Sequence, residues 1–503
     1  MQKPLLQILT LCALCALITL PNLASTGLAD SEAHRVIPAL EMVTTGDYLV
    51  PTMFDQPYVR KPQLVPWLFA AALSINDNPN LSPELPTRLI SAAAFTLMVL
   101  GSFLFARRWF GPHAGFPAAA ALALTPLFWS PARSAEIESV HNLLTALGAW
   151  IAIDLIINAS KPFKHKLPAA LFLTLAALLM LLAKGPAGFP ILLALIISAA
   201  ILSRSIKSFL NLSILIPIAA AAILFAWHWS NTLQAAGPDA IVQSPNAFMF
   251  ETGKLLKLAG FIPVSLLTAL PITLALLFPW GKDAKTEATE STTHTQQLHT
   301  AQLIALAVPL ALLIMMLTGV SNDRYAQPIL APLAPLVGWL LITNLQPHRT
   351  KILRTLTLGS PKIIAAILCV LAVVHITIIE PTKRESSGQL PAQILATDLQ
   401  STLPPTPQST HYTLVADAMI EARPETLLYL RTALENSGYQ LTILWIPKLS
   451  PERLANLAVD GHPPLLALLR TDQNGNESDK VLVAQTIATG KVHEFTFALV
   501  TLD

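Results

Sequence analysis

The chain has 503 residues, of which 53% are hydrophobic and only 12% are charged, and its mean hydropathy of +0.56 excludes an ordinary soluble globular protein. The formal net charge of +2 gives no basic surface of the kind that a nucleic-acid partner requires. The three cysteines, Cys12, Cys15 and Cys369, lie in apolar segments without the spacing of a metal site or a disulfide framework. The class that remains is a membrane protein.

Apolar segments long enough to cross a hydrocarbon layer of roughly 30 Å recur along the first three quarters of the chain. They lie near residues 4–24, 83–106, 112–131, 139–158, 167–184, 187–203, 209–229, 258–280, 300–320, 326–345 and 363–380. The predicted fold class is mainly α: a polytopic membrane protein with about 11 transmembrane helices, amphipathic helices in external loops and a small C-terminal α/β soluble domain.

Basic residues in the connecting loops predict how the chain is oriented in the membrane. They cluster at residues 107–108, 161–166, 204–207, 282–285 and 349–362, all on one side of the predicted bundle. By the positive-inside tendency this side is cytoplasmic. Residues 1–25 are either the first transmembrane helix or a cleaved signal peptide, and both alternatives leave residue 30 outside the cytoplasm.

Two long segments fall on the external side. Residues 25–82 are too many for a simple connector, and the stretch "VIPALEMVTTGDYLVP" has the spacing of an amphipathic helix on the bilayer surface. Loops of this length usually carry function. After residue 380 strand-like and helix-like stretches alternate, which predicts a transmembrane domain over 1–380, with its functional loop at 25–82, and an external α/β domain over 381–503.

Ionisable side chains are costly inside a bilayer, so those retained near the helix ends are the informative ones. Those predicted on the external side are Asp30, Glu32, His34, Arg35, Arg60, Lys61, Arg133, Glu136, Glu138, His141, Lys184, Asp323 and Arg324, followed by Tyr325. Carboxylates together with cations suit a reaction in which a hydroxyl loses its proton while an anionic group, such as a phosphate, departs. The sequence has no Walker loop, GxGxxG or His/Cys cluster, and soluble nucleotide donors are not expected outside the cytoplasm, which leaves a donor carried by a lipid.

Four stretches resemble a known family and occur in that family's order. They are "GLADSEAHRVIPALEMVTTGDYLVPTMFDQPYVRKPQLVPWL", "ARSAEIESVHNLL", "LLAKGPAG" and "SNDRYAQPILAPLAPL". The chain thereby resembles the C-type, polyprenyl-phosphate-dependent glycosyltransferases, in particular the bacterial branch that holds protein mannosyltransferases and lipid A aminoarabinose transferases. In that family the first external loop carries an Asp-Glu pair. Here Glu32 matches the second acid, but Ser31 occupies the first position and Asp30 lies one place earlier.

The resemblance implies an inverting transfer of a sugar from a polyprenyl-phosphate donor to lipid A, a polysaccharide or a protein, at the periplasmic face of a bacterial inner membrane. Asp30 or Glu32 would accept the proton of the acceptor hydroxyl, and we favour Asp30 with Glu32 beside it. Glu138 would bind a divalent cation, orient the sugar or do both, and no other cofactor is implied. The residues expected to bind the donor phosphate are Lys61, Arg324, Tyr325 and Lys184.

Each assignment has a plainer alternative. The acids of "DSEAHR" suit solvated loop charges, Glu138 suits a favourable charge at a helix start, and Lys61 suits an anchor to lipid headgroups. Arg60 fits the anchor better, and His34, Glu136 and His141 read as polar neighbours. For the whole chain the alternatives are a transporter or flippase of lipid-linked sugars, which would need polar groups deep within the helices, and a non-catalytic assembly protein.

Overall fold

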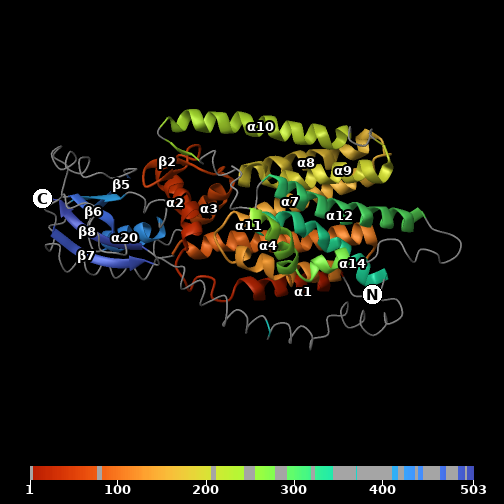
Figure 1. The fold of residues 1–503 in the computed structure, drawn as a ribbon, viewed down its shortest axis with the longest axis horizontal. Helices are drawn as coiled ribbons and strands as arrows, with labels where there is room; N and C mark the ends of the chain where they lie inside the picture. Colours follow the sequence, from red (N-terminus) through yellow and green to blue (C-terminus); the bar gives the residue numbers. More distant parts are fainter. Residues whose placement is uncertain are drawn as a thin grey trace.

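The structure is a computed structural model that describes residues 4–75, 82–205, 211–238, 240–242, 255–277, 292–318, 323–343, 370, 411–416, 424–436, 440–445, 465–471, 485–492 and 495–502. A bundle of helices fills most of the described part, and a five-stranded sheet lies at one end of it (Figure 1). Between the two lie the helices and short strands of the first long loop.

The helices of the bundle are α1 (Pro4–Thr19), α4 (Glu84–Phe110), α5 (Gly115–Ala123), α7 (Glu138–Ile157), α8 (Phe163–Lys184), α9 (Phe189–Ser203), α10 (Leu212–Ala236), α11 (Leu255–Thr268), α12 (Thr292–Leu317) and α14 (Ala334–Thr343). Among the described residues, five helical stretches are long and apolar enough to cross a membrane: Glu84–Phe110, Glu138–Ile157, Lys164–Ser203, Leu212–Ala236 and Thr295–Leu317. Five such stretches indicate a multi-pass membrane protein.

The predicted count of about 11 spans is not confirmed. The segment expected at 112–131 is broken into α5, the short helix η1 (Pro126–Phe128) and α6 (Trp129–Ala132). Pro126 causes the break, because a proline disfavours the helical conformation of the residue before it, and Thr125 is extended with φ −83° and ψ 111°. The segment expected at 363–380 lies, apart from residue 370, outside the described residues.

Small residues let the central helices pack closely. A Cβ atom added to Gly338 would lie 2.3 Å from the carbonyl oxygen of Ala114, so α14 approaches the start of α5 along its backbone. Likewise, a Cβ atom on Gly101 would lie 2.7 Å from the buried ring of Trp150, which joins α4 to α7. Close packing through small residues is the usual way for helices to associate in a membrane.

The first long loop folds into α2 (Asp30–Thr45), β1 (Thr52–Met53), β2 (Gln56–Val59) and α3 (Leu64–Ser74). The helix expected here is observed as α2, which begins earlier than the predicted stretch. Strand β2 pairs antiparallel with β1 and parallel with β3 (Ile241–Val242). Phe54 and Asp55, in the turn before β2, are left-handed with φ of 52° and 63°. Glu41 of α2 supports this turn by accepting the amide of Phe54 at 2.6 Å.

A buried arginine fixes the segment that enters α2. Arg88, on α4, donates to both carboxylate oxygens of Glu32 at 2.8 and 2.7 Å, and both side chains are almost fully buried. The same guanidinium donates to the carbonyl oxygens of Leu23, Thr26 and Gly27 at 2.8 to 2.9 Å. An arginine presents five N–H donors in a planar fork, so one side chain can hold several backbone carbonyls as well as a carboxylate.

A second buried arginine, Arg133, holds the preceding turn. It donates to the carbonyl oxygens of Ile18, Thr19 and Pro21 at 2.6 to 3.1 Å. The last carbonyls of a helix lack partners within the helix, and a cation there also opposes the negative end of the helix dipole. Arg133 therefore completes the C-terminus of α1.

Beyond residue 380, the structure describes β4 (His411–Ala416), α20 (Pro424–Asn436), β5 (Gln440–Trp445), β6 (Leu465–Thr471), β7 (Gln485–Val492) and β8 (Phe495–Leu502). The strands form one sheet in the order β5-β4-β6-β8-β7, in which β4 is parallel to β5 and β6, and β8 is antiparallel to β6 and β7. Strand-like and helix-like stretches were expected to alternate after residue 380, and elements of both kinds occur among the described residues there. The domain boundary at 380 stays a prediction.

We expect Arg88→Met to lower the free energy of unfolding by roughly 3 to 5 kcal/mol, because it leaves the buried Glu32 carboxylate without its counter-charge. Thermal unfolding of the purified protein in detergent would measure this. A matched control is Arg108→Met, since Arg108 pairs with Asp154 at 2.6 Å but is 59% exposed, and exposed pairs contribute at most about 1 kcal/mol. Equal losses in the two variants would contradict the role of Arg88.

Candidate active site

A cavity of about 180 Å³ lies between the first long loop and the helix ends of the bundle. Its lining residues are Ser31, Arg35, Lys61, Glu136, Ile137, Glu138, Lys184, Arg324 and Tyr325. Four of these side chains are cationic and two are acidic. With all of them charged the lining carries an excess of positive charge, which favours an anionic ligand.

Several elements deliver these side chains from distant parts of the sequence. Lys61 follows β2, Glu138 is the first residue of α7, and Lys184 is the last residue of α8. Arg324 and Tyr325 lie in the short helix η7 (Asp323–Tyr325). Each residue thus occupies an element end, where a polar side chain can leave the apolar bundle.

Lys184 and Glu138 form the most enclosed pair of the site. The Lys184 Nζ atom lies 3.0 Å from Glu138 Oε1, and the side chains are 6% and 9% exposed. The same Nζ atom lies 4.3 Å from the centre of the Tyr325 ring, within the range of a cation–π interaction. α8 ends at Lys184 because Gly185 adopts a φ of 70°, a left-handed conformation that suits glycine. The pair joins α7, α8 and η7 at one point.

Glu136 connects α2 to η7 across the cavity. Its Oε1 atom accepts a hydrogen bond from Ser31 Oγ at 2.5 Å, and its Oε2 atom lies 3.7 Å from Arg324 Nη1. Burial and, secondly, the negative charge of Glu138 raise the pKa of Glu136. We predicted Glu136 to be a polar neighbour, whereas the structure makes it part of the cavity lining. The available signal was its place two residues before Glu138 in "EIES".

The surroundings of Lys61 lower its pKa. Burial, followed by the positive charges of Arg35 and Lys184, lowers the pKa of Lys61 to about 8. A phosphate bound here would favour the charged form again, because an opposite charge stabilises the ammonium. Arg35 was not among the predicted ligands, although its position one helical turn after Ser31 places both on the same face of α2.

The structure brings five of the predicted site residues into this cavity: Lys61, Glu138, Lys184, Arg324 and Tyr325. Asp30 is the first residue of α2 and directly precedes Ser31, which lines the cavity. The side chain of Asp30 lies outside the described part of the structure, so its role stays a prediction.

Glu32 does not line this cavity, and its geometry argues against a role as the proton acceptor. Besides both contacts from Arg88, its Oε1 atom accepts the amide of Ala135 at 2.7 Å and its Oε2 atom accepts the amide of Ala29 at 2.8 Å. The side chain is 2% exposed. A carboxylate offers about four acceptor positions, and these four bonds occupy them. Spacing in the sequence alone could not reveal Arg88 as the partner, because Arg88 lies 56 residues away.

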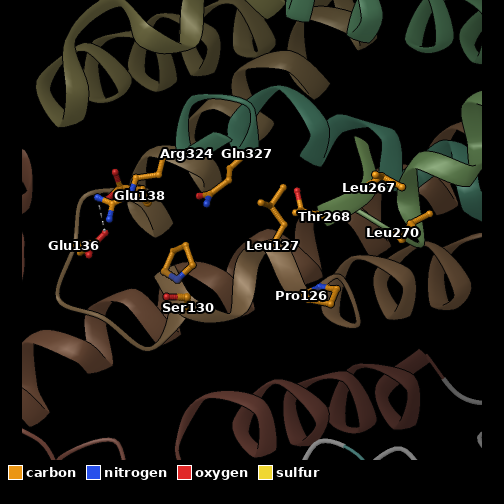
Figure 2. Close-up of a pocket in the computed structure, with 11 residues that line it drawn as sticks. Pro126, Leu127, Ser130, Glu136, Glu138, Leu267, Thr268, Leu270, Arg324 and Gln327 are labelled. Atoms are coloured by element: carbon orange, nitrogen blue, oxygen red, sulfur yellow. Dashed lines mark ion pairs between the residues drawn. The ribbon is translucent and has the colours of Figure 1, made fainter. Parts of the chain in front are cut away.

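A second cavity, of about 450 Å³, adjoins the first and shares Glu136, Glu138 and Arg324 with it. Its remaining lining residues are Pro126, Leu127, Ser130, Pro131, Leu267, Thr268, Leu270 and Gln327. Figure 2 shows the charged side chains at one end of this space and Leu267 and Leu270 at the other. The second cavity is therefore amphipathic.

Comparisons with known proteins point to one family. Residues 60–229 match the family model "Dolichyl-phosphate-mannose-protein mannosyltransferase". Among solved structures, ArnT from Cupriavidus metallidurans in the apo state superposes with a TM-score of 0.67 at 14% identity, covering 98% of this chain and 97% of ArnT. The resemblance to the polyprenyl-phosphate-dependent glycosyltransferases is confirmed. ArnT bound to undecaprenyl phosphate has a TM-score of 0.65 at 14% identity and the same coverage.

A more distant likeness is to the apo oligosaccharyltransferase of Archaeoglobus fulgidus, with a TM-score of 0.50 at 14% identity, covering 93% of this chain and 69% of that one. At these identities the structural likenesses establish the fold. A search of curated protein sequences found no match.

We expect Lys61 to titrate near pH 8 in the intact protein, because burial and neighbouring cations lower its pKa to about 8. Reductive methylation with ¹³C followed by NMR would measure this titration, and the signal absent from a Lys61→Arg variant would be that of Lys61. A midpoint near 10.4, the value of a free lysine, would show that the cavity leaves this amine unperturbed.

Proposed function

We propose that the protein transfers a sugar from a polyprenyl-phosphate donor to a hydroxyl of an acceptor. The observation that carries this proposal is the small cavity in which four cationic side chains face two acidic ones beside a bundle of apolar helices. A phosphate carried on a long lipid is a ligand that suits both features. The family match and the likeness to an ArnT structure with bound undecaprenyl phosphate support this choice of donor.

The cations would act on the leaving group. As the bond between the anomeric carbon and the phosphate oxygen breaks, its electron pair stays on the lipid phosphate, and Lys61 and Arg324 stabilise that charge. Arg35 adds to the positive field from α2. Lys184 contributes less directly, because it already pairs with Glu138 at 3.0 Å. Tyr325 holds the Lys184 ammonium against its ring.

Asp30 is the proposed proton acceptor. The acceptor hydroxyl oxygen attacks the anomeric carbon from the face opposite the phosphate, its proton passes to the Asp30 carboxylate, and the anomeric configuration inverts. The position of Asp30 directly before the cavity-lining Ser31 supports this role, and the four hydrogen bonds to Glu32 favour Asp30 over Glu32.

Glu138 is proposed to orient the sugar together with Lys184. Within the described part of the chain, no group of three His, Cys, Asp or Glu side chains converges on a common point that could hold a metal ion. The Glu138 carboxylate is also held by Lys184. The described residues therefore do not fit a divalent-cation site, and Glu138 is proposed to act as an ion-paired carboxylate.

The sequence resemblance supports a proposal for the side of the membrane and for the acceptor. We propose that the active site faces the periplasm of a bacterial inner membrane, on the same side as residues 381–503. The acceptor would be an envelope component: lipid A, a polysaccharide or a protein. The amphipathic second cavity gives an amphipathic molecule a route to the charged groups.

Reconstituted vesicles test the reaction. The purified protein would receive radiolabelled polyprenyl-phosphate sugars, carrying mannose or aminoarabinose, together with an extract of envelope acceptors. Transfer of label to an acceptor with release of polyprenyl phosphate supports the proposal. Movement of the intact donor across the bilayer without cleavage of its bond would instead support a flippase.

We expect Lys61→Ala to reduce kcat/KM by roughly 100- to 1,000-fold, the usual effect of removing one donor that stabilises a developing negative charge. Arg60→Ala is the matched control. Arg60 is the adjacent cation but does not line the cavity, so its loss should change the rate by no more than about three-fold. Similar losses in both variants would indicate general attraction to lipid headgroups rather than a specific phosphate site.

We also expect the rate at limiting donor to fall as the pH rises above about 8. Lys61 is positive below its pKa and neutral above it, so its attraction for phosphate is present at lower pH and lost at higher pH. In Lys61→Arg the fall should shift by more than about two pH units, because a guanidinium stays charged past pH 12. An unchanged profile in the arginine variant would assign the titration to another group.

A further inference from the structure

Helix α20, from the C-terminal part of the chain, contacts the segment that enters the candidate active site. The hydroxyl of Tyr429 donates to Glu84 Oε1 at the start of α4 and accepts the backbone amide of Leu28 at 2.5 Å. The Tyr429 ring packs against the main hydrophobic core of the bundle. One side chain therefore joins three elements that are distant in the sequence.

Much of α20 is buried. Five of its side chains are no more than 1% exposed: Glu425, Thr426, Leu427, Leu430 and Leu434. α20 contacts both α2 and the edge strand β5, and Figure 1 shows it between the sheet and α2. On its outer face, Arg431 and Glu435 form a pair one turn apart that is 34% and 44% exposed. The contact through Tyr429 is thus part of a packed interface.

Several hydrogen bonds hold the backbone of residues 23–29. Arg88 donates to the carbonyl oxygens of Leu23, Thr26 and Gly27, and Glu32 accepts the amide of Ala29. The hydroxyl of Tyr429, on α20, accepts the amide of Leu28. Asp30 lies two residues after Leu28, so the place of its backbone depends on these bonds.

We propose that Tyr429 is a positioning residue of the active site, which fixes the backbone before Asp30 through Leu28 and Glu84 and so makes α20 a necessary support of the reaction. The kinetic part of this inference rests on the proposed function. Its structural part does not.

The electrostatics agree with this arrangement. Burial, and after it the charge of Glu84, raise the pKa of Tyr429, so its hydroxyl remains a donor over the physiological range. Within the described structure, Glu84 Oε2 has no hydrogen-bond partner, and Glu84 is only 3% exposed. Removing the hydroxyl of Tyr429 would therefore leave a buried carboxylate poorly satisfied, which is costly.

The structural part is tested by hydrogen–deuterium exchange on the intact protein. In Tyr429→Phe, the amides in peptides covering residues 23–32 should exchange at least about ten-fold faster, because one of the bonds that close this segment is lost. Glu435→Gln, on the exposed face of α20, should leave the exchange unchanged. Unchanged exchange in Tyr429→Phe would overturn the proposal.

The kinetic part uses the vesicle assay with a radiolabelled polyprenyl-phosphate sugar, at equal amounts of monodisperse protein. Tyr429→Phe should lower kcat by about 10- to 100-fold, the scale expected when a catalytic group is misplaced. The donor KM should stay within about two-fold, because Lys61 and Arg324 lie on other segments. A merely structural loss would reduce the fraction of folded protein and leave kcat per folded molecule unchanged, which would refute the proposal.

Glu84→Gln provides a second variant that keeps the tyrosine ring and its packing. Because Glu84→Gln and Tyr429→Phe weaken the same bond, their effects on kcat should be less than additive. Additive effects would contradict the proposed link. If the parent protein transfers no sugar, the proposed function fails, whereas transfer by the parent together with an unchanged kcat in Tyr429→Phe would remove only the role of Tyr429.

Discussion

The buried pair of Arg88 and Glu32 is the contact on which the rest of the site depends. A charged pair inside an apolar bundle is favourable only when further hydrogen bonds satisfy both groups, and here backbone groups do so. Arg88 donates to three backbone carbonyls of the loop before α2. Glu32 accepts one backbone amide from that loop and one from the loop before α7. The two loops that lead into α2 and α7, next to the acidic residues of the candidate site, are thereby held against the same ion pair.

Near the Arg88–Glu32 pair, charged side chains come together from the ends of several helices and strands. The bundle keeps its long apolar helices within the membrane and presents Lys61, Glu138, Lys184 and Arg324 where helices and strands begin or end. Burial and, after it, the like charges of Arg35 and Lys184 depress the pKa of Lys61, so an anion bound beside it would stabilise its charged form. A lipid phosphate would relieve that repulsion, and the same cations would stabilise it as it leaves. Binding of the donor and stabilisation of the leaving phosphate would thus rely on the same cationic side chains.

The sequence predicted the class of protein and most of the cavity, because both depend on local signals. Long apolar runs predict helices directly, and Lys61, Glu138, Lys184, Arg324 and Tyr325 stand in short motifs at helix ends. The number of spans could not be predicted in the same way: Pro126 divides an apolar run into short pieces, and hydropathy does not register that break.

Contacts between residues far apart in the sequence could not be predicted from local sequence patterns. Glu32 looks like a catalytic acid in sequence, and its structural role appears only when Arg88 and Ala135 are placed around it. Glu136 likewise gains its place from Ser31 and Arg324. Tyr429 lies 401 residues from Leu28, so a single chain gives no pattern that would pair them.

An experimental structure of the protein with undecaprenyl phosphate bound would test the proposed phosphate site most directly. We expect the phosphate to occupy the small cavity, with an oxygen within about 3 Å of Lys61 Nζ and the Asp30 carboxylate facing the same space. A phosphate bound elsewhere, with Lys61 and Asp30 pointing away from it, would refute the proposed active site.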